Sequence, residues 1–400
     1  MTNPKLGMQT LAIHAGERPD PVTKAASPNL VMSTTYVTGA DVAFSIEGAG
    51  EDDPYVYTRW SNPTVDQLGE KLAILEGAEA CLTFGSGMAA ISTFFLYFLS
   101  SGDRLVMSDV AYAGASELTN DILPRMGIDI VKVDMTDLEA LKAAINPETK
   151  LVYIETPANP IMRLTDIAAV AEIVHGAGLS LAVDSTFATP VATRPIELGA
   201  DYVIHSLTKY IGGHGDALGG ALLGPNDLLT DMHRQINVRF GGILSPFNAW
   251  LILRGVATLP IRMQAHAAGA GQVARFLEQH SKVKRVMYPG LPSHPQHSLA
   301  RQQMDNFSGM LTFQVEDGPR AAQILAEQLA IWHYAVSLGH HRSLIFYLPT
   351  DELLQTSFRL TQQQAAAYRS YAGDGIFRVS VGLEDAGDLC RDLEQGLSAL

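Results

Sequence analysis

Short apolar runs alternate with helix-like segments between about residues 70 and 225 of this chain. Each run is long enough for one strand, and each intervening segment has room for a covering helix. Continuous apolar strands separated by helices indicate a mostly parallel sheet that is buried on both faces. The pattern therefore predicts an α/β fold around a mostly parallel seven-stranded sheet, with strands at 80–84, 104–108, 128–133, 150–155, 179–184, 201–205 and 217–223.

The two ends of the chain have different patterns. Residues 1–60 are rich in proline, glycine and aspartate, which is typical of an extended arm. From residue 255 onward, helical segments such as GAGQVARFLEQH mix with a few strands such as SGMLTFQV, which indicates a smaller α+β lobe. We therefore predict an N-terminal arm (1–60), a large domain (61–254) and a C-terminal α+β domain (255–400). A long linking helix would blur the second boundary.

The composition narrows the classes of function. The 400 residues are 47% hydrophobic, and the net charge of −14 without any basic block argues against a nucleic-acid partner. Cys81 and Cys390 lack the spacing of a metal site, and the N-terminus lacks an apolar signal core. The run Met88–Leu99 is too short to cross a bilayer and is predicted to form a buried helix. We expect a cytoplasmic protein with no metal site and no membrane partner.

Polar and small residues follow the predicted strands. In an open parallel sheet, ligands bind beyond the carboxyl ends of the strands, so the residues found there are candidates for one shared site. Two intervals support the alignment, because Asn159 and Asp184 are 25 residues apart (184 − 159), and so are Asp184 and Lys209 (209 − 184). The candidates are Gly87, Met88, Tyr112, Asn159, Asp184, Ser206, Thr208 and Lys209.

These candidates form a set that suits pyridoxal 5'-phosphate (PLP). The turn GSGMAA opens a helix and offers backbone N–H groups to a phosphate, to which Ser206 and Thr208 add hydroxyl donors. Asp184 can pair with a pyridinium nitrogen, Tyr112 can stack on the ring, and Lys209 can condense with the aldehyde. Each feature alone has an ordinary alternative: a strand–helix turn, a helix cap, a core tyrosine or a surface lysine. Their coincidence in sheet order favours PLP.

Seven motifs spread over nearly the whole chain resemble the Cys/Met metabolism family of fold-type I PLP-dependent enzymes. This family includes cystathionine γ-synthase, cystathionine γ-lyase, cystathionine β-lyase, methionine γ-lyase and O-acylhomoserine sulfhydrylase. Together, and in this order, the motifs are highly specific. They are YTRWSNPT (57–64), FGSGMAA (84–90), ETPANP (155–160), AVDSTFATP (182–190), HSLTKYIGGHGD (205–216), VSLG (336–339) and FRVSVGLED (377–385).

The resemblance implies further roles. Tyr57 and Arg59 are expected to reach the cofactor phosphate of a neighbouring subunit, within a homotetramer built from dimers that share active sites. Arg378 is expected to anchor the α-carboxylate of an amino-acid substrate through a two-pronged contact, with Ser337 and Asn159 in support. Without the resemblance, the segment RWSNPT would be interpreted as a turn and Arg378 as part of a surface ion pair.

The expected chemistry is γ-elimination from an L-amino acid that carries an O- or S-linked group at Cγ. Lys209 would remove protons from Cα and Cβ, and Tyr112 would protonate the leaving group. The alternative is γ-replacement, as in O-acylhomoserine sulfhydrylase or cystathionine γ-synthase, because both paths use the same residues. A third hypothesis, a non-catalytic PLP-binding protein, is disfavoured because Lys209, Tyr112 and Arg378 are all present.

Departures from the family pattern bear on the substrate. Gly114 stands where methionine γ-lyases usually have cysteine, Arg342 where cystathionine enzymes often have glutamate, and Leu338 where β-lyases tend to have tryptophan. The first two weaken methionine and cystathionine as substrates, and the third favours γ chemistry. The roles of His340, His341 and Arg342 stay open between side-chain recognition and a solvated loop. The acidic arm residues would suit a cationic substrate such as canavanine, or form a solvated loop; they are Glu47, Glu51, Asp52 and Asp53.

Overall fold

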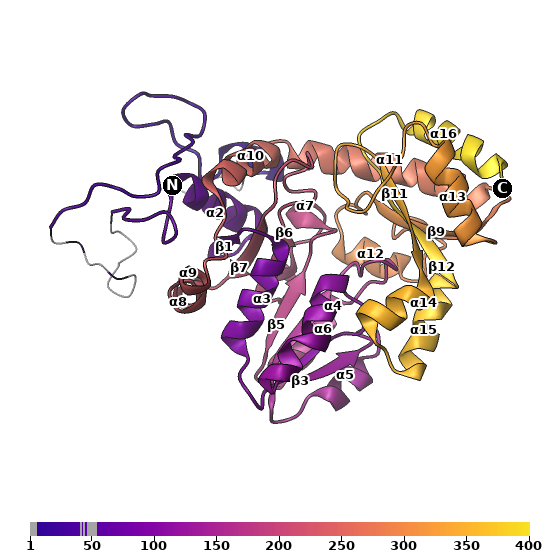
Figure 1. The fold of residues 1–400 in the computed structure, drawn as a ribbon, viewed down its shortest axis with the longest axis horizontal. Coiled ribbons are helices and arrows are strands. Elements are labelled where there is room, and N and C mark those ends of the chain that lie inside the picture. Colours follow the sequence, from indigo (N-terminus) through magenta and orange to yellow (C-terminus); the bar gives the residue numbers. More distant parts are fainter. Residues whose placement is uncertain (1–5, 41, 43–44, 46–53) are drawn as a thin grey trace.

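The protein was analysed as a computed structural model, which describes residues 6–40, 42, 45 and 54–400. Two sheets dominate this part of the chain (Figure 1). Within it, no helix is long and apolar enough to cross a membrane. The acidic residues Glu47, Glu51, Asp52 and Asp53, named above as a possible attraction for a cationic substrate, lie outside the described residues.

The larger sheet confirms the predicted α/β fold. Its seven strands in the described part of the chain lie in the order β1-β7-β6-β5-β4-β2-β3, with β7 antiparallel to both neighbours. The predicted strand positions are close, although β7 begins at Gly220 rather than at residue 217, because Leu218 lies exposed in the preceding loop. The strands are β1 (Ala80–Phe84), β2 (Arg104–Ser108), β3 (Asp129–Val133), β4 (Thr149–Glu155), β5 (Ser180–Asp184), β6 (Tyr202–Ser206) and β7 (Gly220–Gly224).

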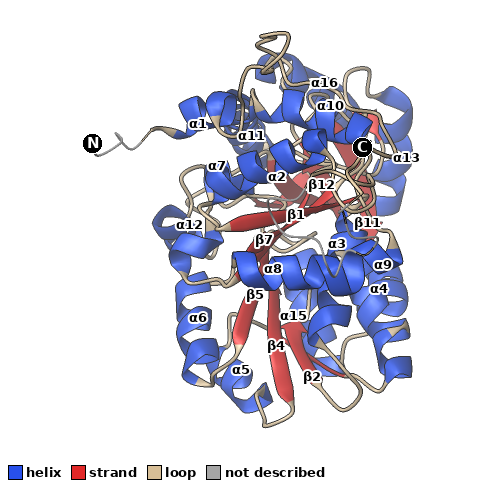
Figure 2. Ribbon diagram, turned by 90° about the vertical axis from the view of Figure 1, so that its left-hand side faces the viewer, coloured by secondary structure: helices blue, strands red, loops and turns tan. Residues whose placement is uncertain are grey.

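Helices cover both faces of this sheet (Figure 2). Along β4, Val152 and Ile154 join one apolar cluster while Leu151 and Tyr153 join the other, which is the period-two alternation of a strand buried on both faces. The first cluster lies under α2 (Pro63–Glu76), α5 (Leu138–Ala144) and α6 (Ile167–Gly176). The second lies under α3 (Gly87–Phe98), α4 (Ala113–Asp121) and α8 (Asn226–Met232).

Helix α3 is the predicted buried helix, and its first turn faces the candidate site. Ser86 caps it, since its hydroxyl accepts a hydrogen bond from the Ala89 N–H at 3.1 Å. Phe94 and Phe95 are fully buried on the inner side. The shorter helices of this region are η2 (Leu123–Met126), α7 (Thr189–Ala192), η3 (Pro195–Leu198), η4 (His233–Asn237) and α9 (Val238–Phe240).

The C-terminal part of the chain forms the expected α+β arrangement. After α10 (Pro246–Val256), the long helix α11 (Leu259–Gln279) leads to a five-stranded sheet with the order β10-β11-β12-β9-β8. These strands are β8 (Val283–Met287), β9 (Met310–Val315), β10 (His333–Tyr334), β11 (Leu344–Pro349) and β12 (Gly375–Ser380). The accompanying helices are α12 (His297–Gln303), α13 (Gly318–Gln328), α14 (Thr350–Leu353), η5 (Leu354–Phe358), α15 (Gln362–Ala372) and α16 (Ala386–Ser398).

Part of the N-terminal segment packs on its own chain. Helix α1 (Met8–His14) lies against α2, where the buried ammonium of Lys71 donates to the carbonyl oxygens of Ala12 (2.8 Å) and Ile13 (3.0 Å). The same ammonium pairs with Glu17 at 2.6 Å. Among the described residues of the predicted arm, Met8–His14 therefore form a docked helix, and residues 15–40 follow without a further helix.

Candidate active site

The amine of Lys209 lies between the two sheets. Lys209 follows β6, and its Nζ donates a hydrogen bond to Ser337 Oγ at 3.0 Å, in the loop between β10 and β11. Burial lowers the pKa of Lys209 to about 8, and the nearby guanidinium of Arg378 adds to the effect. About a tenth of an amine with such a pKa is neutral at pH 7, which makes it available as a nucleophile or a base.

Asp184 ends β5 as a buried carboxylate, with 5% of its surface exposed. It accepts hydrogen bonds from the Tyr153 hydroxyl (3.3 Å) and the Thr186 N–H (3.0 Å). Burial raises the pKa of Asp184, which these hydrogen bonds and the imidazole of His205 oppose. No lysine or arginine of the described ranges forms an ion pair with it. A cationic ring nitrogen on a ligand would therefore compensate its charge.

The first turn of α3 and the end of β6 lie close together. A Cβ atom at Gly87 would lie 3.0 Å from the Cβ of Ser206, so glycine keeps this approach open. The Thr208 hydroxyl is held by the backbone of Gly219, accepting from its N–H at 3.1 Å. The helix start, the glycine and the hydroxyl groups together suit a phosphate, as the sequence predicts.

Tyr112 stands at the start of α4, with 43% of its surface exposed. Burial of its hydroxyl, together with the charges of Glu117 and Glu155, raises the pKa of Tyr112, so the phenol keeps its proton. A Cβ atom at position 114 would lie 2.8 Å from the Tyr112 ring and 2.9 Å from Met88 Sδ. Gly114 therefore lets the ring and the thioether lie close together, and any side chain there would displace one of them.

Arg378, on β12, reaches across to the larger sheet. Its Nη1 donates to Asn159 Oδ1 at 3.0 Å, and its Nη2 donates to the backbone carbonyl oxygen of Ser337 at 3.3 Å. Burial lowers the pKa of Arg378 without removing its charge, because guanidinium pKa values start far above neutrality. Ser337 thus contacts both cations, with its hydroxyl at Lys209 and its carbonyl at Arg378.

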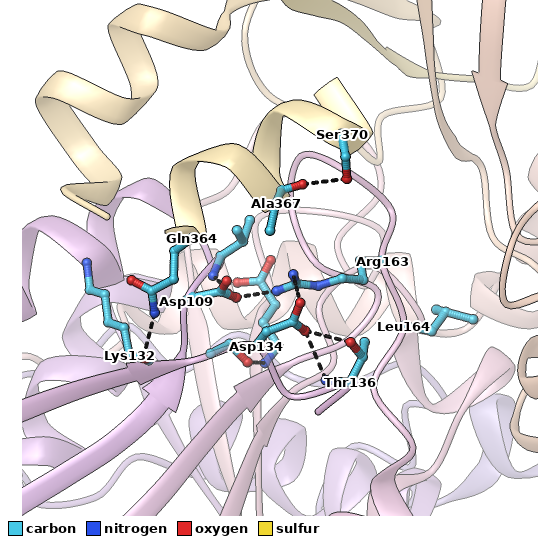
Figure 3. Close-up of polar contacts among 12 residues, drawn as sticks. Asp109, Lys132, Asp134, Thr136, Arg163, Leu164, Gln364, Ala367 and Ser370 are labelled. Carbon is cyan, nitrogen blue, oxygen red and sulfur yellow. Dashed lines mark hydrogen bonds and ion pairs between the residues drawn. The ribbon is translucent and has the colours of Figure 1, made fainter. Parts of the chain in front are cut away.

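An ion cluster around the buried Arg163 side chain lies next to the loop that carries Asn159, and Figure 3 shows Arg163 between Asp109 and Asp134. Arg163, whose exposed fraction is 3%, forms ion pairs with Asp109 and, at 3.0 Å, with Asp134. A backbone bridge joins Ala158 to Arg163, so the cluster and Asn159 belong to one rigid turn. The position of the Arg378 partner is therefore set by charges that lie outside the site itself.

Comparison with known proteins identifies the chain. The Cys/Met metabolism PLP-dependent enzyme family matches residues 9–398. The chain belongs to this family. It is 41% identical to the L-methionine gamma-lyase of Porphyromonas gingivalis, over 98% of both chains. It is also 39% identical to the canavanine gamma-lyase of Pseudomonas canavaninivorans, over 98% of this chain and 96% of the other. The structure of cystathionine gamma-lyase from Lactobacillus plantarum complexed with L-serine superposes with a TM-score of 0.87 at 34% identity, covering 98% of this chain and 99% of that one.

As a member of the Cys/Met metabolism family, the protein is an enzyme that uses PLP, as its sequence predicts. The chain's own geometry suits this cofactor: Lys209 offers a partly neutral amine, Asp184 a buried carboxylate without a lysine or arginine partner in the described ranges, and Gly87 a helix start without a side chain beside the Ser206 hydroxyl. The predicted family, fold and cofactor are thus confirmed. The roles of individual site residues remain predictions.

Two predicted residues lie apart from the others in this family member. Tyr57 is 42% exposed, and Arg59 donates to the carbonyl oxygen of Val238 at 2.6 Å. Within the described ranges, neither side chain forms a hydrogen bond with Lys209 or Ser206. Their predicted reach to a neighbouring subunit is not tested by a single chain.

The sequence argument missed Glu155 and His205. Glu155 ends β4, and its carboxylate accepts from the N–H groups of Tyr112 (2.6 Å) and Asn159 (2.8 Å), so it ties two site residues together. Burial, and then the charge of Asp184, raises the pKa of Glu155 well above its usual range. The sequence could have identified Glu155 as a site residue, because it ends a buried strand in the same way as Asp184. His205 pairs with the buried Glu76 at 2.8 Å, a contact that no local pattern predicts.

Proposed function

We propose that this enzyme is a PLP-dependent lyase that eliminates the γ-substituent of an L-amino acid. The substrate class is homoserine or homocysteine derivatives, in which oxygen or sulfur joins the leaving group to Cγ. The observation that carries the proposal is the double role of Ser337, whose hydroxyl binds Lys209 and whose carbonyl binds Arg378. A carboxylate held by Arg378 would therefore leave the adjacent Cα within reach of the Lys209 amine.

The chain's residues divide the chemistry between them. When bound, PLP withdraws electrons from an amino acid attached to it and so acidifies the C–H bonds at Cα and then Cβ. Lys209 removes these protons, while Arg378 and Asn159 orient the carboxylate. The buried carboxylate of Asp184 would hold positive charge on the ring nitrogen of the cofactor. Tyr112, whose phenol keeps its proton, donates it to the departing group.

The substrate proposal rests on features of the pocket wall. Gly114 replaces the cysteine usual in methionine γ-lyases, and a side chain at this place would collide with the Tyr112 ring, which argues against methionine as the main substrate. Arg342 is exposed and would repel the distal ammonium of cystathionine. Leu338 is buried where β-lyases tend to have tryptophan, which favours γ chemistry. Canavanine stays in the set because of the acidic arm sequence and the similarity to a canavanine gamma-lyase.

A substrate screen tests the proposal. The purified holoenzyme is given methionine, cystathionine, O-acetylhomoserine and canavanine, each with and without a thiol, and 2-oxoacid, ammonia and the leaving group are measured. Release of 2-oxobutanoate and ammonia from at least one compound without thiol supports the lyase. Strict dependence on the thiol would contradict it and favour the γ-replacement alternative. A bound cofactor with no turnover of any compound would favour a non-catalytic PLP-binding protein.

We also propose a cytoplasmic homotetramer in which Tyr57 and Arg59 bind the phosphate of a neighbouring subunit. Support comes from the exposure of Tyr57 and of the apolar side chains of Leu218, Phe240 and Phe247. Mixing inactive Lys209→Ala and Arg59→Ala subunits tests the shared site. Restored activity in the hybrids is the expected result, and hybrids that stay inactive would show that Arg59 does not act across subunits.

The proposed division into an arm (1–60), a large domain (61–254) and a C-terminal domain (255–400) has the two separate sheets as its support. Limited proteolysis of the holoenzyme tests it, because cleavage is expected first in the arm.

A further inference from the structure

A hydrogen-bonded chain leads from the catalytic amine to His340. Lys209 Nζ donates to Ser337 Oγ at 3.0 Å, and the same oxygen lies 3.2 Å from His340 Nε2. The Ser337 oxygen accepts from the amine, so its own proton is free to be donated onward. This arrangement assigns the acceptor role to His340 Nε2, which places the ring proton of neutral His340 on Nδ1.

The surroundings of His340 keep its imidazole neutral, with an unprotonated ring nitrogen. Burial lowers the pKa of His340, followed by the charges of Lys209, His341 and Arg342, while Asp216 opposes the shift. His214 completes the polar neighbourhood, with its ring 5.8 Å from that of His341. At neutral pH the imidazole is therefore uncharged and able to take up a proton.

The backbone next to Ser337 and His340 adopts conformations that permit their contact. A Cβ atom at Gly215 would lie 2.8 Å from His340 Cε1, and Gly215 has a φ of +71°, so glycine makes room for the ring. Ser337 has a φ of +96°, an uncommon conformation for a residue with a side chain. The His341 N–H binds the Gly213 carbonyl at 3.0 Å and joins the two loops.

We propose that Ser337 and His340 relay a proton away from Lys209 during catalysis. In this step an N–H bond of the Lys209 ammonium breaks as an O–H bond forms at Ser337. The original Ser337 O–H bond breaks as an N–H bond forms at His340 Nε2, so one proton moves and the serine is unchanged. The inference rests on the proposed function, because γ chemistry withdraws protons from both Cα and Cβ. The relay gives the Lys209 ammonium a route by which to lose its extra proton, and His340 receives that proton through Ser337.

Hydrogen exchange in the holoenzyme tests the relay without any leaving group. L-norvaline, which has no γ-heteroatom, is incubated with the enzyme in D₂O, and loss of its Cα proton signal is followed by NMR from pH 6 to pH 9. His340→Gln keeps an acceptor for Ser337 but cannot hold a proton at neutral pH. We expect the exchange rate of this variant to be about ten-fold or more below that of the wild type. The wild-type rate should decline at low pH as His340 becomes protonated, and this part of the decline should be absent from the variant.

The matched control is His341→Gln, which changes the adjacent imidazole that lacks a contact with Ser337 among the described residues. We expect its exchange rate at pH 8 to stay near that of the wild type. Equal rates for His340→Gln and the wild type, at equal cofactor loading, would overturn the relay. An equal fall in both variants would overturn it as well, because the effect would then be general to the loop.

A second readout uses cofactor-free protein and needs no turnover. Diethylpyrocarbonate modifies neutral imidazole, so the modification rate of His340 against pH, measured by peptide mass spectrometry, reports its pKa. Lys209→Ala removes the nearby ammonium and is expected to move the His340 midpoint to higher pH. An unchanged midpoint would show that the two groups do not communicate, and would overturn the relay even if His340→Gln fails to fold.

The outcomes separate the two proposals. If no γ-substituted amino acid is cleaved but His340→Gln slows norvaline exchange, the proposed function fails while the relay from Lys209 to His340 remains. If elimination occurs and the exchange rates of His340→Gln and wild type agree, the relay fails while the lyase stands.

Discussion

Two charge clusters in the larger domain of this enzyme are completed in opposite ways. In the cluster of Arg163, Asp109 and Asp134, one guanidinium lies between two carboxylates, and the protein supplies all three groups. At the active site, Asp184 and Glu155 end neighbouring strands at paired positions, and no lysine or arginine of the described ranges forms an ion pair with either. Burial raises the pKa of Asp109, Glu155 and Asp184, and among these three only Asp109 has a bonded guanidinium that opposes the shift.

The difference separates a structural cluster from a binding site. Taking a carboxylate out of water costs free energy that a bonded cation offsets. The Arg163 cluster offsets this cost within the chain and fixes the loop of Asn159. Asp184 has no such bonded cation in the described ranges, so a cationic ring nitrogen bound beside it would offset this cost and stabilise the folded protein. Four changes test this contrast, from the largest expected effect to the smallest.

Replacing Lys209 by alanine has the largest expected effect. The enzyme loses both the covalent attachment of its cofactor and the amine that removes protons, so we expect turnover to fall by about 10⁴-fold or more. Borohydride treatment of the wild-type holoenzyme, followed by peptide mapping, should place the label on Lys209, whereas Lys209→Ala should take up none. Labelling of a different lysine in the wild type would contradict the assignment.

Replacing Arg163 by leucine should cost about 3–5 kcal/mol of stability, because the buried Asp109 carboxylate loses its cation, as does the partly exposed carboxylate of Asp134. Urea unfolding of the cofactor-free protein measures this loss. The double variant Arg163→Leu/Asp109→Asn should recover part of it, since one of the uncompensated charges is gone. If the single variant is as stable as the wild type, the cluster does not hold the Asn159 loop.

Replacing Asp184 by asparagine should separate activity from stability. Activity is expected to fall by about 10²-fold, since the amide cannot hold positive charge on the ring nitrogen. The cofactor-free protein should unfold at the same or a higher temperature, because a desolvated charge has been removed. Asp109→Asn is the matched control and should lower the unfolding temperature by weakening the pair with Arg163. A comparable loss of stability in both variants would remove the contrast between the clusters.

The pH dependence of cofactor uptake has the smallest expected effect. Only the neutral amine attacks an aldehyde, and the pKa of Lys209 is lowered to about 8. The rate of PLP uptake by cofactor-free protein should therefore rise about ten-fold per pH unit below pH 8 and level off above it. Stopped-flow absorbance checks this. A rate that keeps rising toward pH 10 would show a lysine with an ordinary pKa.

The period of the apolar pattern was enough to predict the larger sheet. The order of the strand ends was enough to predict that Tyr112, Asp184 and Lys209 lie at the same edge of this sheet. These features can be predicted locally, because the apolar residues within each strand show that the strand is buried. The contacts of Arg378 and Ser337 come from the second sheet, and only the family resemblance related them to the site. Glu155 and His340 were missed or left open because their partners, Asn159 and Ser337, are set by loops whose folding has no periodic signature.

Ser337 joins the Lys209 amine and the Arg378 guanidinium through two atoms of one residue. Evolution cannot adjust the strength of one contact by moving this backbone without disturbing the other. New specificity in descendants of this enzyme should therefore arise at flanking positions such as the exposed Val336, while the serine between them is retained. Laboratory selection for altered leaving groups would accordingly succeed most often when position 337 is spared.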